Sequence, residues 1–445
     1  MVARDLTHNI DCVCMSKGKK QDLTPDLKMG KNHDNLALKK NYSNASLKKL
    51  IKKEEKMMIL IHQGQVFAPE PLGKKDILIM GNKIGAIKEP GQIRIEGLDV
   101  QVINASEKII LPGFVDSHVH ILGGGGEGGP ATRAPEIAVE DIVSSGVTTV
   151  IGCLGTDGTT RHMQSLLAKA RGLEAEGITT YIYSGSYQIP VVTITGSIRS
   201  DLILIDKVIG AGEIAISDHR SSQPIFTEIA RLAAECRVGG MLGGKAGILH
   251  LHMGDGPRKL EMLFKLITET EIPPTQVIPT HVNRNHELLE EAIEFILQGG
   301  YIDLTAGAEP AAKDNGEISI GEAIKLCLKK QAPLTHITVS SDSNGSMPAF
   351  DKKGNLIGLT IATEKSLLEN FRFLVRKKIL SHQDALRLFS ANPATFYKLN
   401  QKGEIKVGSD ADLILFDKDL NLTDSFAMGG MMISDGKLLA KGTFS

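Results

Sequence analysis

Four histidines of this chain have the type and spacing of metal ligands. His118 and His120 follow the apolar stretch LPGFVDS as an H-x-H pair, and both imidazoles project to one face if the segment is a strand. His252 and His281 end two later apolar stretches. Imidazole is a preferred ligand of zinc and neighbouring transition metals. The H-x-H pair alone is a weak signal, but the four histidines together predict a shared metal site.

Two further features bear on the chemistry of this site. His250 and His252 form a second H-x-H pair, in which one ligand is sufficient. Asp342 ends the stretch ITVSSD, where it either caps a turn or takes a proton from the attacking water and passes it to the leaving nitrogen. Metal ions lower the pKa of bound water and polarise a carbonyl, so they allow attack on an amide near neutral pH. The sequence contains no GxSxG, HExxH or P-loop motif, and metal-dependent amide hydrolysis is therefore the predicted chemistry.

The long middle of the chain must position these residues, and it alternates strand and helix in units of roughly 25 to 45 residues, a rhythm typical of a parallel α/β domain. The candidate strands are 113–121, 148–156, 179–187, 207–216, 248–254, 277–282, 301–306 and 336–342. This pattern favours a (β/α)8 TIM-type barrel over an open doubly wound sheet. In a barrel, residues at the carboxyl ends of all strands meet at one mouth, which is where the histidines and Asp342 would lie.

The two ends of the chain differ from this middle. Short β patterns punctuated by Gly and Asn occur after Met57 and return near the C-terminus. We expect residues 57–111 and 401–445 to form one small β-sandwich beside a barrel of residues 112–400. Residues 1–56 are rich in Lys and Asn and poor in periodic apolar positions, which predicts a disordered or mis-started extension.

Composition narrows the class of protein. The chain has 445 residues and a net charge of -1, which gives no global field for nucleic acid or an anionic membrane. Its five cysteines form no ladder of spacings, and the C-x-C pair at Cys12 and Cys14 lacks a second ligand pair. No apolar run is long enough to span a bilayer. We expect a cytoplasmic enzyme with a small-molecule substrate.

Several motifs resemble those of a known family. DSHVH, THVNRN, SSD, NPATFYKL and GEIKVGSDADLILFD are similar to the amidohydrolase superfamily, and GGGGEGGPATR, LGTDGTTRH, TITGS, ISDHRSS, HMGD and SSDSNGS resemble the isoaspartyl (β-aspartyl) dipeptidases within it. The resemblance runs from about Met58 to the end. It implies two divalent metal ions, Zn²⁺ by family precedent, with ligand roles for His118, His120, His252, His281 and Asp342, the last also as proton shuttle.

The resemblance also implies substrate roles for Gly125, Glu127, Thr156, Tyr187, Arg220, Arg284 and Ser346. Their chemistry agrees, because a β-aspartyl dipeptide carries a free α-amine and two carboxylates. Two arginines can bind the carboxylates through forked hydrogen bonds, and a glutamate can bind the ammonium. Tyr187 can donate a hydrogen bond to the oxyanion.

One position departs from the family pattern, which has a carboxylated lysine bridging the metals from strand four. This sequence has Glu213 there, in GAGEIAISDHR, with one extra residue in the strand. The extra residue, near Gly210 and Gly212, predicts a bulge that brings the carboxylate inward. We expect Glu213 to bridge the ions, with Lys207 as the fallback, and a site degraded to fewer metals as the other outcome.

The leading hypothesis is a metallopeptidase that cleaves β-aspartyl dipeptides by metal-activated hydroxide. One alternative is a dihydroorotase-like or hydantoinase-like enzyme acting on cyclic amides or N-acyl amino acids, and another is a catalytically silent scaffold of the superfamily. Family analogy implies a homo-oligomer.

Overall fold

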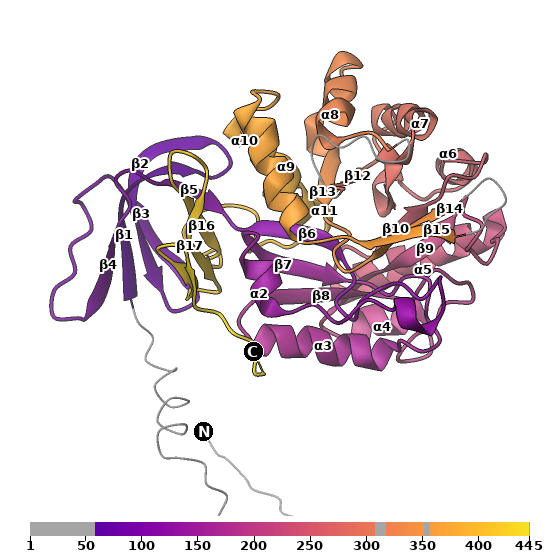
Figure 1. Ribbon diagram of the computed structural model, residues 1–445, viewed down its shortest axis with the longest axis horizontal. Coiled ribbons are helices and arrows are strands. Elements are labelled where there is room, and N and C mark those ends of the chain that lie inside the picture. Colours follow the sequence, from indigo (N-terminus) through magenta and orange to yellow (C-terminus); the bar gives the residue numbers. More distant parts are fainter. Residues whose placement is uncertain (1–57, 308–316, 351–355, 445) are drawn as a thin grey trace, which may run out of the picture. The chain divides into compact units, whose positions relative to one another are not determined.

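The computed structural model describes residues 58–307, 317–350 and 356–444, so the extension predicted for residues 1–56 lies outside the described residues. Its larger part is an α/β barrel (Figure 1). The eight parallel strands are β6 (Phe114–Val119), β7 (Val147–Gly152), β8 (Thr179–Ser184), β9 (Val208–Ile216), β10 (Ile248–Met253), β11 (Val277–Thr280), β12 (Ile302–Thr305) and β13 (Ile337–Ser340). Seven of them fall within a stretch that the sequence pattern predicts, and β7 begins one residue before its predicted stretch. The TIM-type fold is thereby confirmed.

The barrel strands are hydrogen-bonded in chain order from β6 to β11, and β12 pairs with β13 in a separate ladder. A parallel bridge from Val119 to Ser343 joins the last strand's exit to the first strand. Every residue of β6, β7, β9 and β10 is buried, because side chains fill the barrel interior on one face and helices cover the other. The carboxyl ends of these strands therefore share one rim.

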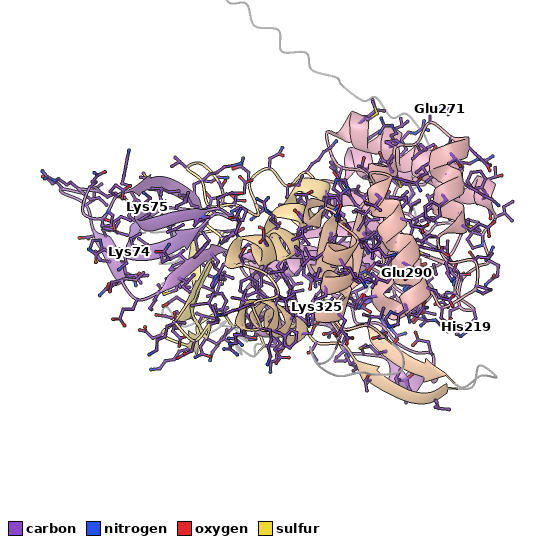
Figure 2. All side chains as sticks on the ribbon, turned by 90° about the horizontal axis from the view of Figure 1, so that it is seen from above. Lys74, Lys75, His219, Glu271, Glu290 and Lys325 are labelled. Atoms are coloured by element: carbon purple, nitrogen blue, oxygen red, sulfur yellow. The ribbon has the colours of Figure 1, made fainter. Side chains whose placement is uncertain are left out.

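Helices connect the strands and present a polar face outwards. They are α2 (Val139–Val143), α3 (Met163–Ala175), α4 (Ile198–Leu204), α5 (Phe226–Gly243), α6 (Glu261–Glu269), α7 (His286–Leu297), α8 (Ile320–Lys329), α9 (Lys365–Arg376), α10 (His382–Leu386) and α11 (Asn392–Phe396). The side chain of Asn285 accepts a hydrogen bond from Leu288 N and so caps α7. Glu290 of α7 and Lys325 of α8 are exposed on the outer face (Figure 2). No described helix is long and apolar enough to cross a membrane.

The two ends of the described chain build one sheet together. It contains β1 (Met58–Phe67), β2 (Pro71–Met80), β3 (Lys83–Lys88), β4 (Val100–Asn104), β5 (Ile109–Pro112), β16 (Leu413–Phe416), β17 (Leu422–Ala427), β18 (Gly430–Ser434) and β19 (Lys437–Leu438). The N- and C-terminal parts meet where β5 pairs antiparallel with β16. Ile61 and Ile77 from one part pack with Leu413 and Phe426 from the other in a separate apolar core. The association of the two ends is as predicted, with all nine strands in one hydrogen-bonded sheet.

One element is absent from the sequence-based prediction. After β13, the chain forms an antiparallel hairpin of β14 (Ser346–Phe350) and β15 (Leu356–Ile361) before it reaches α9. The sequence SNGS had indicated only a turn at this point. Because the hairpin follows a barrel strand at its carboxyl end, it lies at the rim that carries the predicted site.

Candidate metal centre and active site

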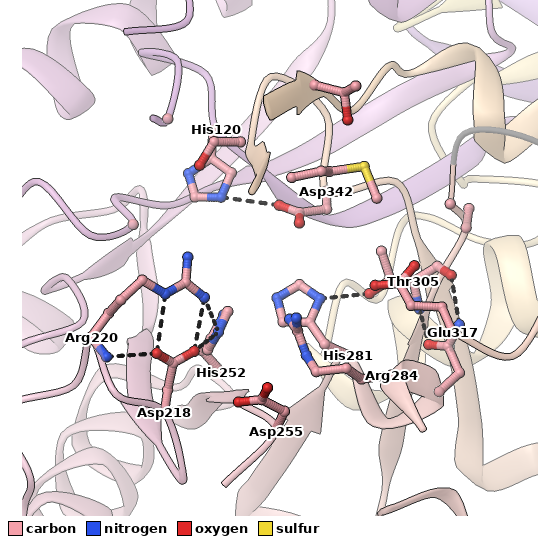
Figure 3. A pocket seen from close by; sticks show the side chains of 18 of the residues that line it. His120, Asp218, Arg220, His252, Asp255, His281, Arg284, Thr305, Glu317 and Asp342 are labelled. Atoms are coloured by element: carbon pink, nitrogen blue, oxygen red, sulfur yellow. Dashed lines mark hydrogen bonds and ion pairs between the residues drawn. The ribbon is translucent and has the colours of Figure 1, made fainter. Parts of the chain in front are cut away.

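The predicted ligands meet at the carboxyl ends of the barrel strands. His118 Nε2 lies 3.5 Å from Glu213 Oε1 and 3.4 Å from Asp342 Oδ1. His120 Nε2 lies 3.3 Å from the same Glu213 oxygen and 3.0 Å from the same Asp342 oxygen. Figure 3 shows His120 and Asp342 pointing toward each other across the cavity. These four side chains, from β6, β9 and the end of β13, therefore direct their ligand atoms at one point.

A second group uses the other oxygen of the same glutamate. Glu213 Oε2 lies 3.0 Å from His252 Nδ1 and 3.6 Å from His281 Nε2. The two Glu213 oxygens thus face different histidine pairs, which is the arrangement that a carboxylate bridging two cations requires. His118, His281 and Asp342 also lie close enough together to share an ion.

The donor set fits divalent cations. Within the described chain, the buried atoms His118 Nε2, Glu213 Oε1 and Asp342 Oδ1 make no hydrogen bond, and leaving such atoms unpaired is costly unless a ligand satisfies them. Burial opposes ionisation of both carboxylates, but the histidines hold the pKa of Glu213 well below its ordinary value and lower that of Asp342 to about 2. The cluster therefore offers two carboxylates and several imidazole nitrogens to cations.

A bulge in β9 brings Glu213 into this cluster. Ala211 pairs with Leu249 and Ile214 with Leu251, so β9 advances by three residues where β10 advances by two. A Cβ at Gly212 would lie 2.8 Å from the carbonyl oxygen of His250, so only glycine fits there. The bulge predicted from the extra residue is confirmed.

The fallback residue, Lys207, is not available for this role, and that part of the prediction is wrong. Lys207 immediately precedes β9, at the end of the strand opposite to the rim. Its ammonium group pairs with Glu174 of α3 and lies over the ring of Tyr181. A six-residue separation along an extended strand keeps it far from the histidines.

Outer contacts fix the orientation of each imidazole. His118 Nδ1 lies 2.8 Å from His250 Nε2, which leaves His118 Nε2 directed at the carboxylates. His281 Nδ1 lies 2.6 Å from Thr305 Oγ1. His250 is therefore oriented as a partner of His118, and it is not among the described residues that could hold a metal ion. A partner on one ring nitrogen selects the tautomer in which the other nitrogen presents a lone pair to a metal.

Asp218 plays the same part for His252, and the sequence reasoning assigned it no role. Asp218 Oδ2 lies 3.0 Å from His252 Nε2 and accepts a hydrogen bond of 2.8 Å from Arg220 (Figure 3). These two bonds turn His252 Nδ1 toward Glu213. The motif ISDHRSS contained Asp218, but nothing in the sequence alone indicated which histidine it would contact.

The predicted substrate residues surround a cavity of about 570 Å³ at this rim. Gly125, Thr156, Tyr187, Arg220, Arg284 and Ser346 all line it, together with His120, His252, His281 and Asp342. The volume is in the range of small-molecule sites. The barrel therefore places the metal-ligand candidates and the substrate candidates in one chamber.

Glu127 lies immediately behind this lining. Its carboxylate accepts hydrogen bonds from Thr156 Oγ1 at 3.0 Å and from Ser346 Oγ at 2.9 Å. Arg220 approaches the same carboxylate at 3.4 Å. Three residues from three different loops thus hold one largely buried negative charge next to the cavity, as recognition of a cationic group requires.

Some polar groups of Arg220, Arg284 and Tyr187 already contact other residues of the protein. Arg220 donates two hydrogen bonds to Asp218, so its fork is already in use on one side. Arg284 donates to the carbonyl oxygen of Met253 through Nε only. The hydroxyl of Tyr187 lies 2.9 Å from His252 Nδ1, and burial raises its pKa well above the ordinary value, so it stays a proton donor near neutral pH.

Arg161 organises the glycine-rich loop, and sequence reasoning gave it no role. This buried guanidinium donates to the carbonyl oxygens of Leu122, Gly124, Gly125 and Ala134. A Cβ at Gly125 would lie 2.6 Å from the carbonyl oxygen of Thr132, and its φ of +77° also favours glycine. The loop that carries Glu127 is thus shaped by its own backbone around one arginine.

One solved structure is similar to this chain over most of its length. The β-aspartyl dipeptidase from the thermophilic keratin-degrading Fervidobacterium islandicum AW-1, in complex with a β-Asp-Leu dipeptide, is 44% identical in sequence, with a TM-score of 0.81. The match covers 86% of this chain and 98% of that chain. The chain belongs to the isoaspartyl (β-aspartyl) dipeptidase family. Residues 322–439 also match the model of the amidohydrolase family.

Two other relatives are less similar to this chain in sequence. An adenine deaminase from Halalkalibacterium halodurans is 23% identical over 401 residues, covering 87% of this chain, and the chain spans only 59% of that relative's length. A dihydroorotase from Streptococcus thermophilus is 22% identical over 406 residues, covering 81% of this chain and 90% of that protein. Together with the clusters of candidate metal ligands, these similarities identify this chain as a hydrolase of the amidohydrolase superfamily.

Proposed function

We propose that the protein hydrolyses β-aspartyl dipeptides and uses two divalent ions, Zn²⁺ in the native enzyme. The observation that carries the proposal is the Glu127 carboxylate, held by Thr156, Ser346 and Arg220 at the wall of the chamber that contains the histidine–carboxylate cluster. A dipeptide with a free α-amine needs an anion at this place. A cyclic amide has no such amine, and this distinguishes the proposal from a dihydroorotase-like activity.

The positions of the substrate follow from the charges around the chamber. Glu127 receives the α-ammonium group, while the guanidinium groups of Arg220 and Arg284 receive the two carboxylates. The β-carbonyl carbon then lies beside the histidine cluster. Holding both ends of the substrate in this way orients the scissile amide and supplies much of the rate acceleration.

The metal ions would be held by His118, His120, His252, His281, Glu213 and Asp342. When bound, they acidify water and polarise the carbonyl of the amide. Asp342 accepts a proton from the attacking water and transfers it to the nitrogen as the C–N bond breaks. Tyr187 donates a hydrogen bond to the oxygen that becomes negative in the tetrahedral intermediate.

The test compares three substrates with the same enzyme preparation: β-Asp-Leu, α-Asp-Leu and dihydroorotate. We expect turnover of β-Asp-Leu, with little or none of the other two. Prior treatment with a chelator should abolish it, and added Zn²⁺ should restore it. If the protein binds two ions and hydrolyses only dihydroorotate, the proposal is wrong and the cyclic-amide alternative is correct. Activity that survives complete metal removal would contradict both.

The arginine assignment has its own test. Arg284→Met should lower kcat/KM for β-Asp-Leu by about 10- to 100-fold, since a charge-assisted hydrogen bond to substrate contributes about 1.5–3 kcal/mol. The comparison substrate is the amide of the same dipeptide, β-Asp-Leu-NH2, which lacks the C-terminal carboxylate. Equal losses on the acid and on the amide would contradict recognition of that carboxylate by Arg284.

A further inference from the structure

The histidine–carboxylate cluster contains one further buried candidate ligand atom. Cys153 follows β7 directly, and its side chain is 1% exposed. Its sulfur lies 3.8 Å from His120 Nδ1 and 4.0 Å from His120 Nε2. The ligand atoms of Cys153, His118, His120 and Glu213 all lie within 4.8 Å of one another.

These separations suit a single ion. A Zn–S bond of 2.3 Å and a Zn–N bond of 2.1 Å place a sulfur and a nitrogen at most about 4.4 Å apart, and the observed 4.0 Å is shorter. Two other atoms of the group, His118 Nε2 and Glu213 Oε1, are buried and make no hydrogen bond within the described residues. They are an observation independent of the cysteine that points to a ligand at the same place.

We propose that Cys153 is a further ligand of the ion held by His118, His120 and Glu213. Its thiol proton is released to solvent as the sulfur–metal bond forms. The sulfur, which does not line the cavity, supplies negative charge from the end of β7. This charge adds to that of Glu213, whose side chain is shorter than the carboxylated lysine of the family pattern. A thiolate favours zinc, cobalt and cadmium over magnesium, calcium and manganese.

The proposal rests on the proposed metal centre and not on the identity of the substrate. The alternative is that Cys153 only packs, since it belongs to a buried apolar cluster that includes Val115 and Ile151. Packing and ligation differ in a property that can be measured without turnover. A thiolate bound to Co²⁺ gives a sulfur-to-cobalt charge-transfer band in the near ultraviolet, and a thiol that merely packs does not.

The experiment replaces both ions of the full-length protein with Co²⁺ and records the absorption spectrum. We expect the charge-transfer band in the wild type and its loss in Cys153→Ser at equal cobalt content. Cys236→Ser and Cys327→Ser remove buried thiols outside the cluster, and Cys12→Ser/Cys14→Ser removes the C-x-C pair. These control variants should all keep the band. In chelator competition, the more weakly bound of the two Zn²⁺ ions should have a Kd at least about tenfold higher in Cys153→Ser than in the wild type.

Two results would overturn the proposal: a wild type with two cobalt ions and no band, or a band that persists in Cys153→Ser. If that variant does not fold, ¹¹³Cd NMR of the wild type decides instead. One resonance shifted downfield by sulfur supports ligation, and two resonances typical of nitrogen and oxygen ligands exclude it. A wild type that binds no metal contradicts the metal centre itself and with it this inference, whereas bound metal without substrate turnover contradicts only the dipeptidase proposal.

Discussion

Two buried charged clusters of this protein differ in whether all their polar atoms have hydrogen-bond partners within the described residues. Where the barrel contacts the C-terminal segment, the side chain of Lys402 is 3% exposed, and its ammonium group lies 2.6 Å from Asp412 and 2.9 Å from Asp410. Thr179 of β8 accepts a further hydrogen bond from it. Every charge in this lysine cluster has a partner supplied by the chain.

The rim cluster of His118, His120, Glu213 and Asp342 lacks that balance. Two carboxylates face imidazoles, and three buried ligand atoms make no hydrogen bond in the described part of the chain. Buried polar atoms are tolerated when something satisfies them. The lysine cluster is therefore complete as a structural element, whereas the rim cluster is organised for cations that the chain does not supply.

Glu213→Gln should produce the largest effect, because an amide carries no charge and has only one oxygen to offer two ions. We expect metal content to fall from two ions per chain to at most one. Activity should fall by more than the loss of about 10- to 100-fold that follows mutation of a residue contacting a metal ligand. Elemental analysis and turnover measure both. Lys207→Met, at the other end of the same strand, is the control and should retain two ions. Two tightly held ions in Glu213→Gln would disprove bridging.

Asp342→Asn should separate proton transfer from metal binding. The amide keeps an oxygen for the ion but cannot carry the proton, so kcat should fall by about 10²- to 10⁴-fold while both ions remain bound. Steady-state kinetics and metal analysis of the same sample provide the measurement. A variant that stays fully active would mean that Asp342 is not the shuttle.

Lys402→Met should reverse this pattern, with a loss of stability and no loss of metal. Leaving Asp410 and Asp412 without their buried partner costs about 3–5 kcal/mol, measured by denaturant unfolding. Lys406→Met removes an exposed pair with Glu404 and should cost less than about 1 kcal/mol. If Lys402→Met lost metal as readily as stability, the two clusters would not be independent.

Asp116→Asn should give the smallest effect, visible as a pH dependence. Burial raises the pKa of Asp116 from 3.8 to about 6, although its hydrogen bonds with Ser341 and with the His118 backbone oppose this. Between these pH values the folded chain holds a proton that the unfolded chain releases, so wild-type stability falls as pH rises through the window. The amide does not titrate. Unfolding of the two metal-free proteins from pH 4 to 7 should therefore diverge by about 2 kcal/mol, and parallel curves would contradict the assignment.

Much of the site could be predicted because each signal lies within one short segment. His118 and His120 share a strand face through their i, i+2 spacing, and the extra residue near Gly212 had one local consequence, the bulge. The contacts of Asp218, Arg161 and Cys153 could not be predicted in this way. Each depends on which strands become neighbours, as when Asp218 after β9 reaches His252 of β10.

The order of strands and helices and the residue types at the strand ends follow from local sequence patterns, because periodicity and turn residues act over a few positions. Which atoms meet depends on how the whole chain packs. Closure of the barrel brings His118 of β6 next to Asp342 after β13, more than 200 residues later, and turns the two oxygens of Glu213 toward different histidine pairs. That arrangement depends on strand register and on burial, which are properties of the packed chain and not of any one segment.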